Sequence, residues 1–201
     1  MAKKNLSASI YTSGLIITGL KHCGKSSLGM RLAQTLSLPF YDLDTLILED
    51  ISGEGYLSVR ELYRTAGRSK FQEHELAAAK KLAGIMENTA AVAALGGGTI
   101  ENEKALGMLP SRAPLLYLHV EEEELFRRIS ASGIPPFLEG DRRPEELFAD
   151  IYARRTVLYE RAADALLHLP AQPLEKNFSR LYTFLTASDR QKKTNGTGGC
   201  G

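Results

Sequence analysis

The stretch Gly19-Leu20-Lys21-His22-Cys23-Gly24-Lys25-Ser26 sets the architecture of this chain, because it matches the pattern G-x-x-x-x-G-K-[ST]. Residues 15–18 before it are apolar or β-branched, as in a buried parallel strand. Residues 27–38 after it carry leucines at helical spacing. A strand, a glycine-rich loop and a helix in this order predict a phosphate-binding P-loop.

This loop predicts contacts with a polyphosphate. Gly19 and Gly24 permit the tight turn, so that backbone N–H groups and the positive end of the helix face a polyphosphate. Lys25 is expected to reach the β- and γ-phosphates, and the Ser26 hydroxyl is expected to bind Mg²⁺. Ser27 is a further expected nucleotide contact. The alternative is a glycine turn that merely begins an ordinary helix.

Length and composition limit the classes of protein that this chain fits. Its 201 residues, 43% of them hydrophobic, can bury one sizeable core, and we expect a single domain. The net charge of +1 gives no reason to expect nucleic acid or a membrane as partner, so we expect a small-molecule ligand. The sequence shows neither an apolar run of about 20 residues nor a signal-peptide core, which predicts a cytoplasmic protein. We also expect a monomer.

Short apolar segments alternate with helix-like segments, which predicts an α/β fold with a five-stranded parallel sheet flanked by helices. The expected strands are residues 15–18, 40–42, 91–95, 115–118 and 165–169. The expected helices cover residues 27–38, 58–64, 70–86, 121–130, 144–163 and 173–187, and Gly67 separates the second from the third.

The ends of the chain and one internal loop fall outside this alternation. Residues 1–12 show no clear pattern and are expected to form a partly ordered lead-in segment. Residues 13–188 then form the domain, in which the Gly- and Pro-containing residues 131–143 are a candidate lid. Residues 189–201 are expected to be a disordered tail.

Two carboxylates follow the second expected strand, in the sequence Asp42-Leu43-Asp44. Strand alternation predicts that both point the same way, at the edge of the sheet beside the P-loop. There Asp42 is placed to hold hydrated Mg²⁺, and Asp44 to orient or deprotonate a substrate hydroxyl. The alternative for Asp44 is that it caps the next helix.

A glycine triplet, Gly96-Gly97-Gly98, follows the third expected strand. Bare backbone at this position lets a small ligand approach both the sheet edge and the phosphates. The alternative is an ordinary turn.

Together these motifs resemble those of the shikimate kinase family, small P-loop kinases of the nucleoside monophosphate kinase type. The resemblance covers residues 14–170, and besides the P-loop, the two aspartates and the glycine triplet it includes Phe71 with Glu75 in a Phe-Arg-x-x-Glu-like motif, and Arg155. It implies MgATP-dependent phosphorylation of one hydroxyl of shikimate. By the resemblance, Asp44 grips the accepting hydroxyl, Arg155 the carboxylate, and Arg128 lies near the nucleotide.

Three positions depart from the family pattern. Gln72 replaces the carboxylate-binding arginine of the Phe-Arg-x-x-Glu motif, and it cannot make the bidentate arginine–carboxylate pair. Pro135 replaces the lid arginine that meets phosphate, and His22 replaces a further P-loop glycine. Surface charge is the default interpretation for the other cations that could substitute: Lys21, Arg127, Arg142 and Arg143.

These departures leave two alternatives to a shikimate kinase. One is a diverged kinase for another polyol or sugar acid, whose acceptor needs no arginine at position 72. The other is a nucleotide-binding homologue without kinase activity.

Overall fold

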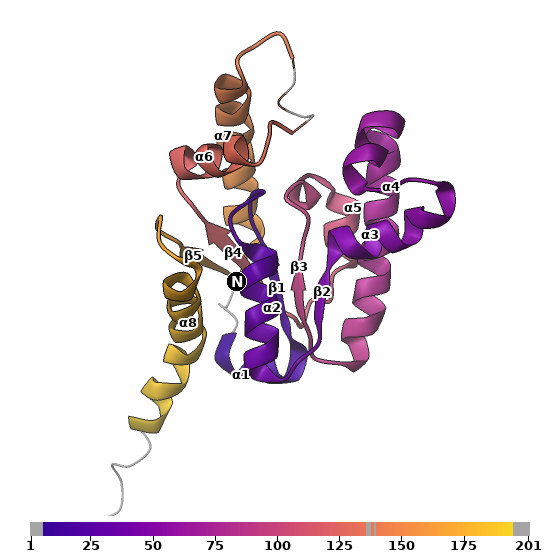
Figure 1. The fold of residues 1–201 in the computed structure, drawn as a ribbon. Helices are drawn as coiled ribbons and strands as arrows, with labels where there is room; N and C mark the ends of the chain where they lie inside the picture. The colour runs from indigo at the N-terminus through magenta and orange to yellow at the C-terminus, as the bar shows by residue number, and fades with distance from the viewer. Residues whose placement is uncertain (1–5, 136–137, 139, 195–201) are drawn as a thin grey trace, which may run out of the picture.

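A five-stranded parallel sheet forms the centre of the molecule (Figure 1). The computed structural model describes residues 6–135, 138 and 140–194. The strand order is β2-β3-β1-β4-β5, which confirms the predicted α/β fold. The strands are β1 Leu15–Thr18, β2 Phe40–Asp42, β3 Val92–Ala94, β4 Leu115–His119 and β5 Ala165–His168.

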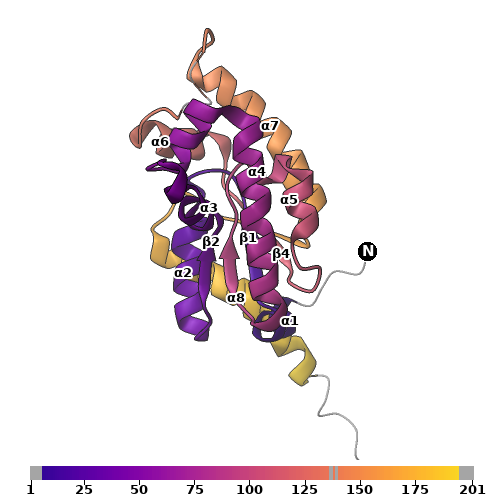
Figure 2. The ribbon, with the colours of Figure 1, turned by 90° about the vertical axis from the view of Figure 1, so that its right-hand side faces the viewer.

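Helices connect the strands and cover both faces of the sheet (Figures 1 and 2). The α-helices are α1 Leu6–Ser13, α2 Lys25–Leu36, α3 Leu43–Ile51, α4 Val59–Asn88, α5 Glu103–Met108, α6 Glu122–Ala131, α7 Pro144–Ala162 and α8 Leu174–Thr194. Two short 3-10 helices, η1 Ser52–Glu54 and η2 Thr99–Glu101, complete the set within the described residues.

The central strand β1 is buried on both faces, and its alternating side chains enter two cores. Leu15 and Ile17 pack in a core that includes side chains of α2, α7 and α8. Ile16 points to the opposite face and packs in a core with side chains of α3 and α4. This double burial explains why the strand is a continuous apolar run without alternating polar residues.

Strand register brings the predicted motifs to one edge of the sheet. Ile17 of β1 pairs with Ala94 of β3 and Leu116 of β4, and Asp42 at the end of β2 also pairs with Ala94. The P-loop, the two aspartates and the glycine triplet all follow the carboxyl ends of these strands. Figures 1 and 2 show α6, α7 and part of α4 extending beyond the same edge.

Helix α4 is interrupted at Gly67, where φ is 80° and ψ is 177°. The two expected helices at 58–64 and 70–86 therefore correspond to its two halves. Ser58 begins the first half by accepting a hydrogen bond from the Glu61 N–H at 3.1 Å.

Helices occupy part of both ends of the predicted domain. Residues 6–12 of the expected lead-in belong to α1, because Ile10 is buried in a core that also contains Leu181 of α8. Residues 189–194 of the expected disordered tail continue α8. Residues 1–5 and 195–201 lie outside the described residues. Within the described part of the chain, no helix is long and apolar enough to cross a membrane.

Candidate active site

The P-loop turns between β1 and α2 through residues in the left-handed backbone region. Gly24 is the N-cap of α2, with φ of 100°. A Cβ atom at Gly19 would lie 2.6 Å from the Leu118 carbonyl oxygen, so only glycine fits there. His22 also has a positive φ, at 65°, so its backbone adopts the left-handed conformation in which glycine is favoured.

Two P-loop side chains are held by neighbouring groups. Lys25 is buried, and its Nζ donates a hydrogen bond to the Leu20 carbonyl oxygen at 3.0 Å. The Ser26 hydroxyl donates to Asp42 Oδ2 at 2.5 Å. Because hydroxyl and carboxylate oxygens are ligands that Mg²⁺ prefers, Ser26 and Asp42 together fit a magnesium site.

The two aspartates reach the site by a route that strand alternation did not predict. Asp42 ends β2 and is itself the N-cap of α3, since its Oδ1 accepts the Asp44 N–H at 3.0 Å. Asp44 stands in the first turn of that helix and is not its cap. Both carboxylates nevertheless line the same cavity as Lys25.

Asp44 is open to this cavity but is surrounded closely by protein. Desolvation by burial raises the pKa of its carboxyl above the ordinary value, and the Asp42 carboxylate raises it further. Lys25 and Lys21 act in the opposite direction and lower this pKa. Asp44 is therefore a carboxylate whose proton affinity is higher than that of an exposed aspartate.

The first two glycines of the triplet, Gly96 and Gly97, pack so tightly that a side chain would not fit without movement of a neighbour. A Cβ atom at Gly96 would lie 2.9 Å from Asp44 Oδ1, and one at Gly97 would lie 2.8 Å from the Lys21 backbone nitrogen. Gly98 lies beside Arg155, whose Nη2 would be 3.5 Å from such an atom. The triplet thus brings bare backbone between the P-loop and the aspartates.

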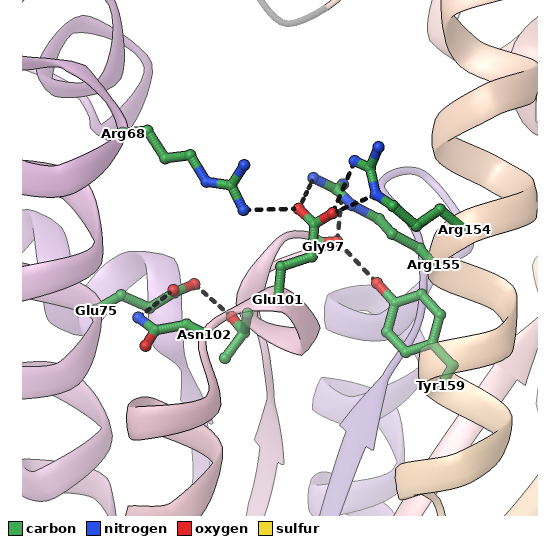
Figure 3. Close-up of polar contacts among 9 residues, drawn as sticks. Arg68, Glu75, Gly97, Glu101, Asn102, Arg154, Arg155 and Tyr159 are labelled. Carbon is green, nitrogen blue, oxygen red and sulfur yellow. Dashed lines mark hydrogen bonds and ion pairs between the residues drawn. The ribbon is translucent and has the colours of Figure 1, made fainter.

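The buried side chain of Glu75 fixes the residues that follow the triplet (Figure 3). Its two carboxylate oxygens accept hydrogen bonds from Thr99 Oγ1 at 2.6 Å and from Asn102 Nδ2 at 2.9 Å. Burial raises the pKa of Glu75, and these hydrogen bonds offset the rise only in part. Glu75 therefore anchors η2 to α4.

Three arginines meet at the carboxylate of Glu101 (Figure 3). Arg155 Nη2 and Arg154 Nη2 of α7 lie 2.8 and 2.7 Å from its oxygens, and Arg68 Nη2 of α4 lies 3.7 Å away. Burial alone would raise the pKa of Glu101, but the hydrogen bonds and charges of Arg155 and Arg154 outweigh it and lower that pKa. Arg155 also donates to the Gly97 carbonyl oxygen at 3.0 Å, so it is tied to the triplet.

These elements enclose a cavity of about 400 Å³. Most of the predicted site residues line it, but Gly19 and Gln72 are not among the lining residues. Gln72 is half-buried, and its backbone carbonyl accepts a hydrogen bond from Asn102 at 3.0 Å. The predicted residues that line the cavity are Gly24, Lys25, Ser26, Ser27, Asp42, Asp44, Gly96, Gly97, Gly98 and Arg155.

Two polar lining residues, besides apolar ones, escaped the sequence analysis. Arg60 and Tyr63 project into the cavity from the first half of α4, and Arg60 Nη2 donates to the Ile134 carbonyl oxygen at 3.0 Å. Arg60 is thus adjacent to Pro135, which also lines the cavity. Neither residue belongs to a recognisable motif, so only the fold reveals them.

A second cavity, of about 440 Å³, opens on the other side of Gly24. Arg128 lines it, and this residue donates to the His22 carbonyl oxygen at 3.2 Å and to Glu124 Oε1 at 2.7 Å. Hydrogen bonds from Arg127 and Arg128 lower the pKa of Glu124 to about 2. Burial, together with neighbouring positive charges, lowers the pKa of His22.

Comparison with known proteins identifies this arrangement. A family model for shikimate kinase matches residues 21–186. Shikimate kinase from Chlamydia pneumoniae is 33% identical over 177 residues, which cover 85% of this chain and 98% of that relative. The chain belongs to the shikimate kinase family.

Solved shikimate kinase structures share the fold. Shikimate kinase from Acinetobacter baumannii, in complex with shikimate, matches with a TM-score of 0.76 and 22% identity, covering 90% of this chain and 97% of that one. Shikimate kinase from Bacteroides thetaiotaomicron matches with a TM-score of 0.69 and 26% identity, covering 85% and 97%. The predicted kinase fold is therefore confirmed.

The other cations that could replace the missing family arginines at positions 72 and 135 differ in their surroundings. Lys21 lines the main cavity. Arg127 pairs with Glu124, and Arg142 and Arg143 both pair with Glu146 on α7. These three exposed arginines thus have surface partners, whereas Arg60, which was not considered, faces the cavity. Residues 136, 137 and 139 of the predicted lid lie outside the described residues.

Proposed function

We propose that this protein transfers the γ-phosphoryl group of ATP to a hydroxyl of shikimate. One observation carries the proposal: a single cavity is lined on one side by the P-loop and on the other by Asp44, the glycine triplet and Arg155. Membership of the shikimate kinase family supports it. The cavity is large enough to hold a small acceptor next to the end of a triphosphate.

The P-loop side of the cavity binds and orients the phosphates. Backbone N–H groups at the start of α2 and the Lys25 ammonium group face the β- and γ-phosphates. Ser26 and Asp42 would hold Mg²⁺, which would neutralise charge on the transferred group. The nucleoside would lie in the second cavity, which Arg128 lines.

Asp44 orients the accepting hydroxyl and takes its proton. As the hydroxyl oxygen bonds to the γ-phosphorus, the bond from that phosphorus to the β–γ bridging oxygen breaks and ADP leaves. The elevated pKa of Asp44 suits it as a base, because it increases the affinity of the carboxylate for this proton. Activity is consequently expected to fall as the pH drops through that pKa.

The carboxylate of shikimate binds at the arginines around Glu101. Arg155 lines the cavity, and its position is fixed by Glu101 and by the Gly97 carbonyl. Arg68 stands four residues before Gln72 on α4, so both residues belong to the same helix face. The Arg68 side chain is 57% exposed and only loosely paired with Glu101, which leaves its guanidinium able to turn toward a ligand. Arg68 does not itself line the cavity, and only after such a turn would it supply the second charged contact that Gln72 cannot make.

The lid prediction for residues 131–143 remains part of this proposal. Pro135 carries no charge, so the positive charge next to the reacting phosphate comes from Arg60. The guanidinium of Arg60 donates a hydrogen bond to the carbonyl oxygen of Ile134, the residue before Pro135. Guanidinium groups stabilise the charge of phosphoryl-transfer transition states. Arg60 would act in this way once a nucleotide is bound.

The decisive experiment measures ADP release from MgATP with a panel of acceptors. Shikimate-dependent turnover in the wild type, lost in Lys25→Ala with the fold intact by circular dichroism, is expected. Turnover with a neutral polyol or another sugar acid but not with shikimate would instead favour a diverged kinase. ATP binding without turnover on any acceptor would favour an inactive homologue.

A further inference from the structure

A second group of chemically capable side chains lies at the carboxyl ends of β4 and β5. His119 ends β4, His168 ends β5, and Glu121 precedes α6. One ligand atom from each of these side chains lies within 4.8 Å of the others. None of the three lines the cavities described above.

Hydrogen bonding determines which nitrogen of His119 carries the proton. The Tyr152 hydroxyl lies 2.9 Å from His119 Nε2 and 3.2 Å from the Val120 carbonyl oxygen. Since a carbonyl can only accept, both hydrogen bonds form together only when the hydroxyl donates its proton to Val120 and accepts the Nε2–H of His119. The other nitrogen, Nδ1, is left with a lone pair.

This lone pair is buried without a hydrogen-bond partner. His119 is only 8% exposed, and its Nδ1 makes no hydrogen bond within the described residues. Glu121 Oε1 lies 3.9 Å from it, too far for a hydrogen bond. A nitrogen lone pair facing a carboxylate is unfavourable unless a proton or a metal cation lies between them.

The other two residues are free to complete such a site. Glu121 is the N-cap residue of α6, but its carboxylate makes no capping hydrogen bond, and its side chain is 79% exposed. The His168 ring packs edge-on against the His119 ring, with centroids 4.6 Å apart. Small rotations of these two exposed side chains suffice to close the group around an ion.

We propose that His119, Glu121 and His168 form a binding site for Zn²⁺. Two imidazole nitrogens and one carboxylate oxygen are a usual zinc ligand set, with the fourth position left to water. Bond lengths of about 2.0–2.2 Å would bring His119 Nδ1 and Glu121 Oε1 a few tenths of an ångström closer than they stand here. The Tyr152 hydroxyl would be the outer partner that orients the His119 ring.

Zinc at this position would join three elements that the chain otherwise connects by packing. β4, β5 and the start of α6 would share one ion, and Tyr152 would link the site to α7. The ion would therefore stabilise the fold without contacting the reacting groups. This proposal does not rest on the proposed function.

The test uses Zn²⁺ itself with the full chain, in excess Mg²⁺ so that oxygen-only sites are occupied. All proteins carry Cys200→Ser, because that thiol is a competing ligand. Wild type, His168→Ala, Glu121→Gln, Tyr152→Phe and the matched control Glu123→Gln are compared. Zinc content after desalting, zinc affinity by competition with a chelator, and the thermal midpoint are measured.

We expect one zinc per chain and a zinc-induced rise of the midpoint in wild type and in Glu123→Gln. His168→Ala and Glu121→Gln should lose both effects, and Tyr152→Phe should weaken affinity about 10–100-fold. Cobalt bound in place of zinc should give the absorption bands of a tetrahedral site only in wild type and in Glu123→Gln. Equal zinc content in all variants, or no zinc in any, would overturn the proposal.

Discussion

The two sides of the cavity are built in different ways. On the phosphate side, backbone N–H groups and adjacent residues of one loop, with Lys25 and Ser26, supply the contacts. On the acceptor side, side chains come from α3, both halves of α4 and α7, and the glycine triplet adds backbone; these segments lie far apart in the sequence. The P-loop binds through backbone groups, so its function depends on one local sequence pattern. The acceptor side binds through side chains from several helices, so an arginine at one position can take the place of an arginine at another.

The largest effect that would test this contrast is expected from Asp44→Asn. Loss of the proton acceptor should reduce kcat about 10²–10⁴-fold while the Kd for ATP changes little. A fall in ATP affinity with an unchanged rate per bound complex would instead place Asp44 on the phosphate side.

The same variant has a pH-dependent effect on stability. Burial raises the pKa of Asp44 in the folded state, so the folded protein tolerates the protonated carboxyl better than the charged one. The free energy of unfolding therefore decreases as the pH rises through that pKa. The substituted amide stays neutral at every pH, so the variant should melt at a higher temperature than wild type at about pH 7.5, with the difference shrinking toward about pH 4. Thermal midpoints across this range check the sign.

Arg60→Ala should have the next largest effect. Losing one charged contact to the transferred phosphate is worth about 1.5–3 kcal/mol, or roughly 10–100-fold in kcat. The matched control is Arg143→Ala, whose guanidinium pairs with Glu146 at the surface. Equal rates for both variants in a single-turnover assay would remove Arg60 from the reaction.

A smaller effect is expected from Arg68→Ala, which tests the exchange of arginines directly. The KM for shikimate should rise about 5–30-fold, since a charged hydrogen bond is worth about 1–2 kcal/mol more than a neutral one. Gln72→Arg, one turn further along the same face, should restore the KM in the Arg68→Ala background. An acceptor without a carboxylate should be unaffected by either change.

If Gln72→Arg improves KM as much in the wild-type background as in Arg68→Ala, the two positions act independently. Arg68 would then not be the substitute proposed for the missing arginine.

The smallest expected effect concerns the backbone of the phosphate side. His22→Gly should relieve a left-handed residue and stabilise the fold by about 0.5–1 kcal/mol, seen in urea unfolding. Ser37→Gly, at φ of 55° after α2 and outside the lining of both cavities, is the control. Similar gains in both variants would identify strain as the cause, whereas destabilisation by His22→Gly would mean that the imidazole is needed.

The sequence predicts the sheet and the phosphate side well, because those features depend on local patterns. The apolar run at 15–18 and the spacing from Gly19 to Ser26 define β1 and the P-loop without any distant contact. By contrast, α1 exists because Ile10 reaches a core shared with α8, which no local pattern reveals.

The acceptor side shows the limit of motif reasoning. A motif places the acceptor arginine at position 72, but the cavity is lined by Phe71 and Glu75 and not by Gln72. Arg60 and Arg68 belong to no recognisable motif. Arg60 lines the cavity and Arg68 lies near Glu101, and both positions depend on the break in α4 at Gly67. Such residues become visible only when the chain is folded.

The carboxylate of Glu101 has a consequence for the entropy of binding. It already fixes the rotamers of Arg154 and Arg155 in the ligand-free protein. Immobilising a long side chain costs about 0.5–1.5 kcal/mol when it happens on association. Folding has ordered these guanidinium groups in advance, so the carboxylate proposed to bind at Arg155 would meet it in a single conformation and would bind with a smaller loss of side-chain freedom.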